Sequence, residues 1–222
     1  MSPSRLIFRV IYMRLIKQLL THKGKIGAFD LVQTVSQGRT LFLGDGNLSF
    51  SRALAKLKPS AARDFTATTF EPAVRLSPRT LQNASQLARM SAKVLNGIDA
   101  TRLQAHFGTT KFHAIIFNFP NVASRTPIYG HNPNHILAHK FLRSAAGQLV
   151  HGGLVVMTAV DSTFYAGAFG LPAAARFAGF GEPEIHEFKP SRFPGYIHAN
   201  TLDGRSALTK YRSFGTWVFR LP

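Results

Sequence analysis

The sequence predicts an α/β fold: a mainly parallel sheet with helices on both faces and an antiparallel edge at the C-terminal end. Three observations support this prediction. Short β-forming segments alternate with helix-forming segments from Thr40 onward, which is typical of βαβ units. The first β-forming segment ends in the turn Gly44-Asp45-Gly46, and a helix-like pattern follows it. The last segment, 184–221, is long enough to fold back as a hairpin.

Three strands are expected in the first half of the domain: Thr40–Leu43, Phe65–Phe70 and Lys93–Leu95. Helices over Asn47–Lys58 and Ser77–Ser91 connect these strands. Ser77 is a typical N-cap residue. Pro78 suits the first helical position because a missing N–H costs no hydrogen bond there.

Four strands are expected in the second half: Phe112–Phe117, Leu154–Val160, Glu184–Phe188 and Tyr211–Leu221. A helix over Asn134–Val150, stopped by Gly152-Gly153, separates the first two of these strands. Another helix around Pro172–Ala178 precedes the hairpin. The alternation of strands and helices favours a parallel sheet that is buried on both faces.

The composition limits the classes of function. The chain has 222 residues, of which 45% are hydrophobic, enough for one sizeable core. It carries 27 lysines and arginines against 10 acids, a net charge of +17. This excess favours a polyanionic partner, with RNA or DNA as the first expectation and a membrane surface as the alternative. The absence of cysteine excludes disulfides, thiolate metal sites and a cysteine nucleophile, and it is compatible with the cytoplasmic location that we expect.

We divide the chain into a basic amphipathic N-terminal extension, residues 1–37, and a domain spanning residues 38–222. Apolar residues of the extension recur at helical spacing, but arginines interrupt them too often for a membrane-spanning helix or a signal peptide. We therefore expect no stable membrane insertion. Three interpretations are open: a basic helix on RNA or on a membrane surface, a helix packed on the domain, or an over-extended start with Met13 as a later start site.

Polar residues follow four of the expected strands, at the carboxyl ends where parallel sheets bind ligands. Gly44 and Gly46 follow the first strand. Glu71 follows the second, 71 − 46 = 25 residues further on, near the ~20-residue offset of an acid that accepts bonds from ribose hydroxyls. Asp99 follows the third strand and can accept a bond from an adenine amino group. With Asn118 after the fourth strand, these residues predict one nucleotide-type site.

Several segments of the domain form an ordered set of motifs: Leu43–Ser51, Gly97–Leu103, Phe112–Asn121, the helix start marked by Asn134, Leu137 and Phe141, and Phe193–His198. In order and in spacing, this set resembles the signature motifs of the 25S ribosomal-RNA uridine-N3 methyltransferase-like family. The resemblance covers about residues 38–222.

The resemblance implies a Rossmann-like class I methyltransferase fold, S-adenosyl-L-methionine as cofactor and RNA, most plausibly ribosomal RNA, as partner. It assigns cofactor binding to Gly44, Asp45, Gly46, Asn47, Ser49, Glu71 and Asp99. It assigns catalysis to Asn118, Phe119, Pro120 and His198. In this assignment the N–H groups up to Ser49 face the methionine part of the cofactor, Asn118 bonds the target base and Phe119 stacks on it. No metal is expected.

The chain departs from the family pattern on the substrate side. Met157–Val160 lacks the family's lysine, and Ala199-Asn200 stand where the family has two arginines. A non-catalytic basic RNA-binding protein on the same fold is therefore the alternative function. Methylation of uridine N3 requires removal of a proton, and the candidate general bases are His198, Asp161 and Asp45.

Two further groups of residues were considered as sites. His131, His135 and His139 are spaced by four, so one helical face would carry them. We interpret them as a polar or RNA-facing surface, because the carboxylate that usually completes a zinc site is absent. The late basic residues are expected to form either a phosphate-contacting rim or a solvated edge: Lys189, Arg192, Arg205, Lys210 and Arg212.

Overall fold

The computed structural model describes residues 29–122, 124, 126–160, 168–198, 206 and 213–222. The chain divides into two compact units, Met1–Asp30 and Leu31–Pro222, and the second unit contains the sheet. Residues 1–28 of the predicted extension lie outside the described residues. The last part of that extension begins the second unit, where helix α2, Leu31–Thr34, buries Leu31 and the following Val35.

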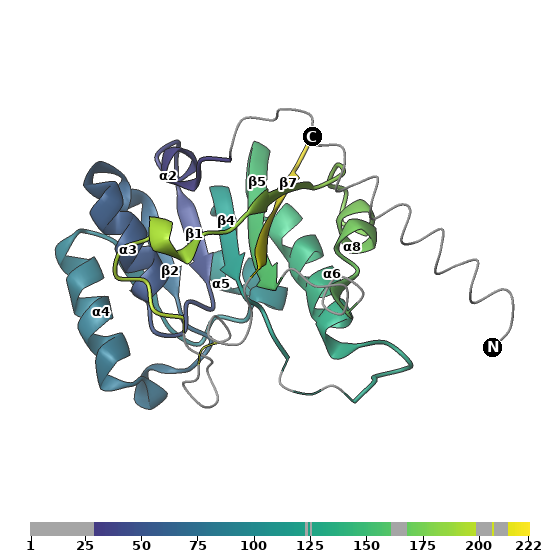
Figure 1. Ribbon diagram of the computed structural model, residues 1–222, viewed down its shortest axis with the longest axis horizontal. Coiled ribbons are helices and arrows are strands. Elements are labelled where there is room, and N and C mark those ends of the chain that lie inside the picture. The colour runs from purple at the N-terminus through teal and green to yellow at the C-terminus, as the bar shows by residue number, and fades with distance from the viewer. Residues whose placement is uncertain (1–28, 123, 125, 161–167, 199–205, 207–212) are drawn as a thin grey trace, which may run out of the picture. The chain divides into compact units, whose positions relative to one another are not determined.

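Within the described residues, seven strands form one sheet in the order β3-β2-β1-β4-β5-β7-β6 (Figure 1). Strands β1 to β5 are parallel, whereas β7 is antiparallel to both β5 and β6. The predicted fold class is thus confirmed, including the antiparallel C-terminal edge. The strands are β1 Thr40–Leu43, β2 Phe65–Thr68, β3 Lys93–Leu95, β4 Phe112–Asn118, β5 Leu149–Val160, β6 Glu184–Glu187 and β7 Phe214–Arg220.

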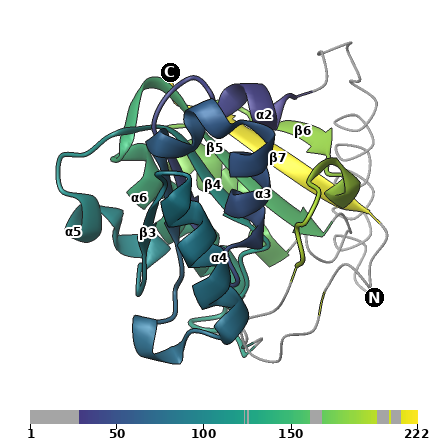
Figure 2. The same ribbon diagram turned by 90° about the vertical axis from the view of Figure 1, so that its left-hand side faces the viewer.

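Helices cover both faces of this sheet (Figures 1 and 2). Leu41 and Leu43 of β1 are buried in the cluster that includes the α6 and α8 side chains. Phe42, between them in the chain, packs edge-to-face on Phe50 of α3 and on Phe65. This alternation explains why the central strands carry apolar residues on both faces. The helices are α3 Ser49–Leu57 and α4 Pro78–Arg89 on one face, and α5 Leu103–Phe107, α6 Pro133–Ala146 and α8 Leu171–Phe177 on the other.

The predicted helix over Asn134–Val150 is too long. Helix α6 ends at Ala146 with Gly147 as its C-cap, and Leu149 and Val150 already belong to β5. The backbone N–H of Phe112 in β4 donates to the Gln148 carbonyl at 2.8 Å. The residues after α6 therefore pair with β4 and extend β5 instead of continuing the helix. Helix α5 was not predicted, because its five residues are too few to show a helical period.

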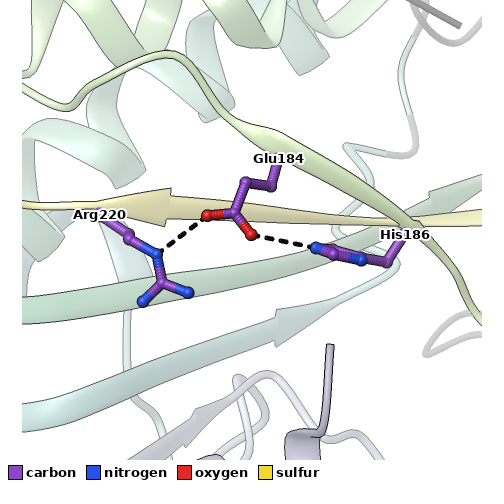
Figure 3. Close-up of polar contacts among 3 residues, drawn as sticks. All are labelled: Glu184, His186 and Arg220. Carbon is purple, nitrogen blue, oxygen red and sulfur yellow. Dashed lines mark hydrogen bonds and ion pairs between the residues drawn. The ribbon is translucent and has the colours of Figure 1, made fainter. Parts of the chain in front are cut away.

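A polar cluster links strands β6 and β7 at the outer edge of the sheet (Figure 3). Glu184 accepts hydrogen bonds from Arg220 Nε at 3.0 Å and from His186 Nε2 at 3.2 Å. Burial alone would raise the pKa of Glu184, but the bonds from Arg220 and His186 outweigh burial and lower it. Because the cluster is partly solvated, its contribution to stability is small. No helix among the described residues is long and apolar enough to cross a bilayer.

Candidate functional site

A cavity of about 860 Å³ lies at the carboxyl ends of β1, β2 and β4. The loops after these strands line it together with residues 98–100 after β3 and the segment Tyr196–His198. All of the predicted site residues except Ser49 line this one cavity: Gly44, Asp45, Gly46, Asn47, Glu71, Asp99, Asn118, Phe119, Pro120 and His198.

The glycine turn after β1 brings the backbone to the cavity wall. Gly44 has φ of 55°, and a Cβ atom there would lie 3.0 Å from Cε2 of Phe117. Only glycine fits both the left-handed conformation and this close approach. Asp45 follows Gly44. Its carboxylate is occupied by the protein, because it accepts hydrogen bonds from Ser51 N and Ser51 Oγ, both at 2.7 Å.

The first turn of α3 is therefore satisfied by the protein itself. Asp45 also accepts a bond from Phe50 N at 3.4 Å, and Ser49 N donates to Asn47 Oδ1 at 3.0 Å. The prediction that the N–H groups up to Ser49 face a ligand is wrong for Leu48 and Ser49, whose N–H groups donate to the Asp45 carbonyl and to Asn47 Oδ1. Beyond Ser49, a buried carboxylate takes the place of an external anion at the helix N-terminus.

Burial controls the ionisation of two groups on this side of the cavity. It raises the pKa of Asp45, while the bonds from Ser51 and Phe50 and the charge of Arg52 act in the opposite direction. Burial also raises the pKa of the Tyr196 phenol, and the nearby Asp45 carboxylate raises it further. Tyr196 therefore keeps its proton at neutral pH.

Glu71 and Asp99 offer acceptors from the ends of β2 and β3. The Glu71 carbonyl is fixed by Gly97 N at 3.0 Å and Thr69 Oγ1 at 2.8 Å. The side-chain Oε2 of Glu71 is buried without a hydrogen-bond partner among the described residues. Asp99 uses Oδ1 to accept from Thr101 N at 2.8 Å and Thr101 Oγ1 at 2.7 Å. Its second oxygen accepts no hydrogen bond from the described residues and can accept one from a ligand, so both acids fit the roles expected from the sequence.

Asn118 at the end of β4 is the most exceptional polar side chain in the cavity. Both amide atoms, Nδ2 and Oδ1, are buried without a partner in the described part of the chain. A buried amide costs free energy unless a ligand supplies the missing hydrogen bonds. Asn118 therefore presents one donor and one acceptor to whatever enters the cavity.

Phe119 next to it has a left-handed backbone, with φ of 50°, which is uncommon for a bulky residue. Its N–H donates to the Thr158 carbonyl at 2.7 Å. Its ring packs edge-to-face on His198 at 4.7 Å between centroids, and also on Phe214 and Phe188. The structure thus gives Phe119 a role in fixing the cavity wall, in addition to the stacking role that the sequence suggests.

The His198 segment is held over the glycine turn by side chains of the first βα unit. Ser49 Oγ donates to the Ile197 carbonyl at 3.0 Å and accepts from Ile197 N at 3.0 Å. Asn47 Nδ2 donates to the same carbonyl at 2.7 Å, and Arg52 Nη2 donates to the Gly195 carbonyl at 2.9 Å. Ser49 is buried beneath this segment and does not reach the cavity.

The three candidate general bases differ in the structure. Asp45 is committed to the N-terminus of α3, and Asp161 lies outside the described residues. His198 lines the cavity, and burial lowers its pKa, which favours the neutral imidazole. Its Nδ1 lies 3.3 Å from Ser206 Oγ. His198 is therefore the candidate base that the described residues support.

The histidines His131, His135 and His139 do not line the cavity, and neither do Lys189 and Arg192. His131 and His135 stack at 5.7 Å, and His135 and His139 lie 4.3 Å apart between ring centroids. The described residues contain no group of three or more potential ligands arranged for a metal ion. Lys189 pairs with Glu187 at 3.1 Å. Arg205, Lys210 and Arg212 lie outside the described residues.

Phe70, Arg75 and Tyr196 line the cavity but were not predicted as site residues. Tyr196 belongs to a motif noted in the sequence, and that membership was a usable signal. Phe70 precedes Glu71 and Arg75 follows it by four residues, but a position near an acid in the sequence is too common to single them out. Phe70 is 64% exposed, so it stands at the mouth of the cavity.

Comparison with known proteins identifies a matching family. The family profile described as rRNA (uridine-N3-)-methyltransferase BTM5-like matches residues 41–200. An uncharacterized protein of Arabidopsis thaliana is 27% identical over 182 residues, which cover 77% of this chain and 85% of that protein. Heavy metal-associated isoprenylated plant protein 41 of Arabidopsis thaliana is 34% identical over 90 residues, 39% of this chain; the match spans only 18% of that protein's length.

Solved structures support the fold. The 16S rRNA methyltransferase KamB aligns with a TM-score of 0.53 at 11% identity, over 86% of this chain and 91% of that chain. The aminoglycoside resistance methyltransferase NpmB1 aligns with a TM-score of 0.51 at 15% identity, over 86% of this chain and 90% of that chain. At these identities, the likeness establishes a Rossmann-like methyltransferase architecture.

Proposed function

The chain belongs to the BMT5-like rRNA (uridine-N3-)-methyltransferase family, and we propose that it transfers a methyl group from S-adenosylmethionine to N3 of a uridine in ribosomal RNA. One observation carries the proposal: Glu71, Asp99 and Asn118 come from three different strand ends and line the same cavity, and the buried atoms Oε2 of Glu71 and Nδ2 and Oδ1 of Asn118 have no hydrogen-bond partner among the described residues. The net charge of +17 suits an RNA substrate. A cytoplasmic location stays a prediction.

The cavity fits an adenosyl cofactor. Its volume of about 860 Å³ lies within the range of small-molecule sites. The buried Oε2 of Glu71 can accept a bond from a ribose hydroxyl, and the open oxygen of Asp99 can accept one from the adenine amino group. When bound, S-adenosylmethionine supplies an electrophilic methyl group on a sulfonium.

Asn118 is suited to hold the target base. Its Nδ2 can donate to a uracil carbonyl oxygen, and its Oδ1 can accept from a donor elsewhere on the same nucleotide such as a ribose hydroxyl, which leaves the in-plane position at N3 open for proton removal and for the methyl donor. An amide does not take up the N3 proton, so a separate base must remove it, and we assign that role to His198. Orientation by the rigid wall around Phe119 then supplies the alignment on which an in-line transfer depends. A base in a duplex must first be flipped out.

The proposal is tested in two steps with the full chain. Isothermal titration with S-adenosylmethionine should show binding, and Glu71→Ala and Asp99→Ala should each weaken it. Asp64→Ala is the matched control, because Asp64 is an acid on the surface helix η1, Pro59–Asp64, away from the cavity.

Bulk ribosomal RNA is then incubated with methyl-labelled donor, and the nucleosides are separated by mass spectrometry. The expected product is 3-methyluridine. Cofactor binding without transfer to ribosomal or transfer RNA would overturn the catalytic proposal and leave the non-catalytic RNA-binding alternative. Absence of cofactor binding would overturn the assignment of Glu71 and Asp99 as well.

A further inference from the structure

The segment between β4 and α6 ends in a tight hairpin that the proposed site does not use. Ile128 N donates to the His131 carbonyl at 2.9 Å, and His131 N donates to the Ile128 carbonyl at 3.0 Å. The two residues between them, Tyr129 and Gly130, have φ of 50° and 78°. Positive φ at both positions is the signature of a type I′ turn. We call Ile128–His131 the tyrosine hairpin.

Tyr129 is an unusual residue for the tip of this turn. Its first central position favours Asn, Asp or Gly, because a bulky residue is strained in the left-handed region. The Tyr129 side chain is 96% exposed, so packing on the fold does not compensate for the strain. A strained and solvated aromatic ring is better explained by a contact outside the chain than by stability.

The tyrosine hairpin is tied to the substrate side of the cavity. The chain leaves Asn118 and lines the cavity with Pro120, Asn121 and Val122 before it reaches the hairpin. Val122 N donates to Asn134 Oδ1 at 2.8 Å, which closes the base of the segment on the start of α6. In Figure 1 this segment extends beyond the carboxyl ends of the strands, beside the base of α6.

The lack of acidic residues in the sequence around the tyrosine hairpin favours a negatively charged partner such as RNA. Between Asp99 and Asp161 the sequence contains no aspartate or glutamate. Within residues 118–140, around the hairpin, the basic residues other than histidine are Arg125 and Lys140. No carboxylate of this stretch would repel a phosphate backbone.

We propose that Tyr129 stacks on an unpaired base of the RNA substrate, at a nucleotide flanking the one held in the cavity. This inference rests on the proposed function, because it takes the cavity to hold a nucleotide of RNA. Aromatic side chains on rigid loops are a common way to hold single-stranded RNA, and stacking tolerates any base. The fixed turn reduces the conformational entropy lost on binding.

The test measures binding of a fluorescein-labelled oligouridylate to the full chain by anisotropy at fixed salt. Tyr129→Ala should weaken binding about tenfold, in the range known for loss of one base–aromatic stack. Tyr129→Phe should bind like the wild type, because the ring is kept. Phe177→Ala is the matched control, since Phe177 is another exposed aromatic, 62% exposed, on α8.

Tyr129→Gly separates stacking from a structural role. Glycine relieves the left-handed strain, so the thermal midpoint should stay the same or rise while RNA binding falls as in Tyr129→Ala. An oligouridylate with one 2-aminopurine gives direct evidence: its fluorescence should be quenched by wild type and Tyr129→Phe more than by Tyr129→Ala.

If Tyr129→Ala binds the oligouridylate as tightly as the wild type does, the inference is overturned, and contact with another protein becomes the explanation for the exposed ring. An equal loss in Phe177→Ala would also overturn it, because the effect would then be general to exposed aromatics. The failure of the proposed function looks different. In that case the wild type transfers no methyl group to ribosomal RNA, whatever the oligouridylate affinities are.

Discussion

The two halves of the cavity are built in different ways. In the cofactor half, acids are held by neighbours in the sequence: Asp45 by Ser51, six residues on, and Asp99 by Thr101, two residues on. In the substrate half, the His198 segment is held by Ser49, and the bonded residues Ser49 and Ile197 are 148 positions apart. The carboxylates of Asp45 and Asp99 are thus held by local turns, whereas the His198 segment depends on the finished fold.

The halves also differ in how their polar atoms are satisfied. Asp45 accepts three hydrogen bonds and Asp99 two from the protein. Asn118 makes none with either amide atom among the described residues. Unpaired buried groups are retained where a ligand completes them. This contrast indicates that the Asp45 and Asp99 parts of the cofactor half are preformed, whereas Asn118 in the substrate half and Oε2 of Glu71 in the cofactor half gain hydrogen bonds only when a ligand arrives.

Asn118→Ala should give the largest effect, and it should impair the use of RNA without impairing cofactor binding. It removes the donor and the acceptor that orient the base, so we expect kcat on RNA to fall about 100-fold. The cofactor affinity should stay within about twofold by titration calorimetry, because no hydrogen bond of the cofactor half involves Asn118. If Asn118→Ala loses cofactor affinity as Glu71→Ala does, the two halves are not separate.

Glu71→Ala breaks the cofactor half. Loss of charge-assisted bonds to the cofactor should weaken its binding by about 1.5–3 kcal/mol, or roughly 10- to 100-fold. The thermal midpoint without cofactor should not fall, since Glu71 Oε2 has no hydrogen-bond partner among the described residues. Glu71→Gln keeps one acceptor and should give an intermediate affinity. A variant that unfolds at lower temperature would show instead that Glu71 serves the fold.

Ser49→Ala tests the long-range connection between the halves. It removes both bonds to Ile197, at about 1 kcal/mol each. We expect kcat/KM for RNA to fall about tenfold because His198 is then less well positioned, with cofactor affinity nearly unchanged. Ser36→Ala is the control, since Ser36 Oγ donates to the nearby Gln33 carbonyl in an exposed turn. A parallel loss of cofactor affinity in Ser49→Ala would contradict this interpretation.

The same contrast explains what the sequence could predict. Strands β1 and β3 have the predicted bounds because short β-forming segments between turns leave little choice. The lining residues after β1 to β4 were predicted because strand ends share one edge of a parallel sheet. The clamp of Ser49 on Ile197 was not predicted, and Ser49 was assigned to the cofactor instead. Nothing local to Ser49 distinguishes a hydroxyl that binds a ligand from one that binds a distant loop.

The change of the wild-type rate with pH should be the smallest of these effects, and it tests whether His198 is the base. Burial lowers the pKa of His198, so the neutral form that accepts a proton is present down to a pH below the usual value of ~6.5. We expect kcat/KM to fall in acid and to level off already below about pH 6.5, with little change up to about pH 8. Single-turnover rates across this pH range measure the profile. His198→Asn should lose most of the activity, and the remaining activity should no longer fall in acid.

Stability follows the same direction, so stability alone does not identify the base. Burial lowers the pKa of both His139 and His198. The unfolded chain therefore binds more protons below about pH 6.5, and the free energy of unfolding falls as the pH drops through that window. His139→Asn should reduce this acid loss of stability and leave the acid limb of kcat/KM in place. An acid limb that disappears in His139→Asn, or persists in His198→Asn, would assign the titration to a group other than His198.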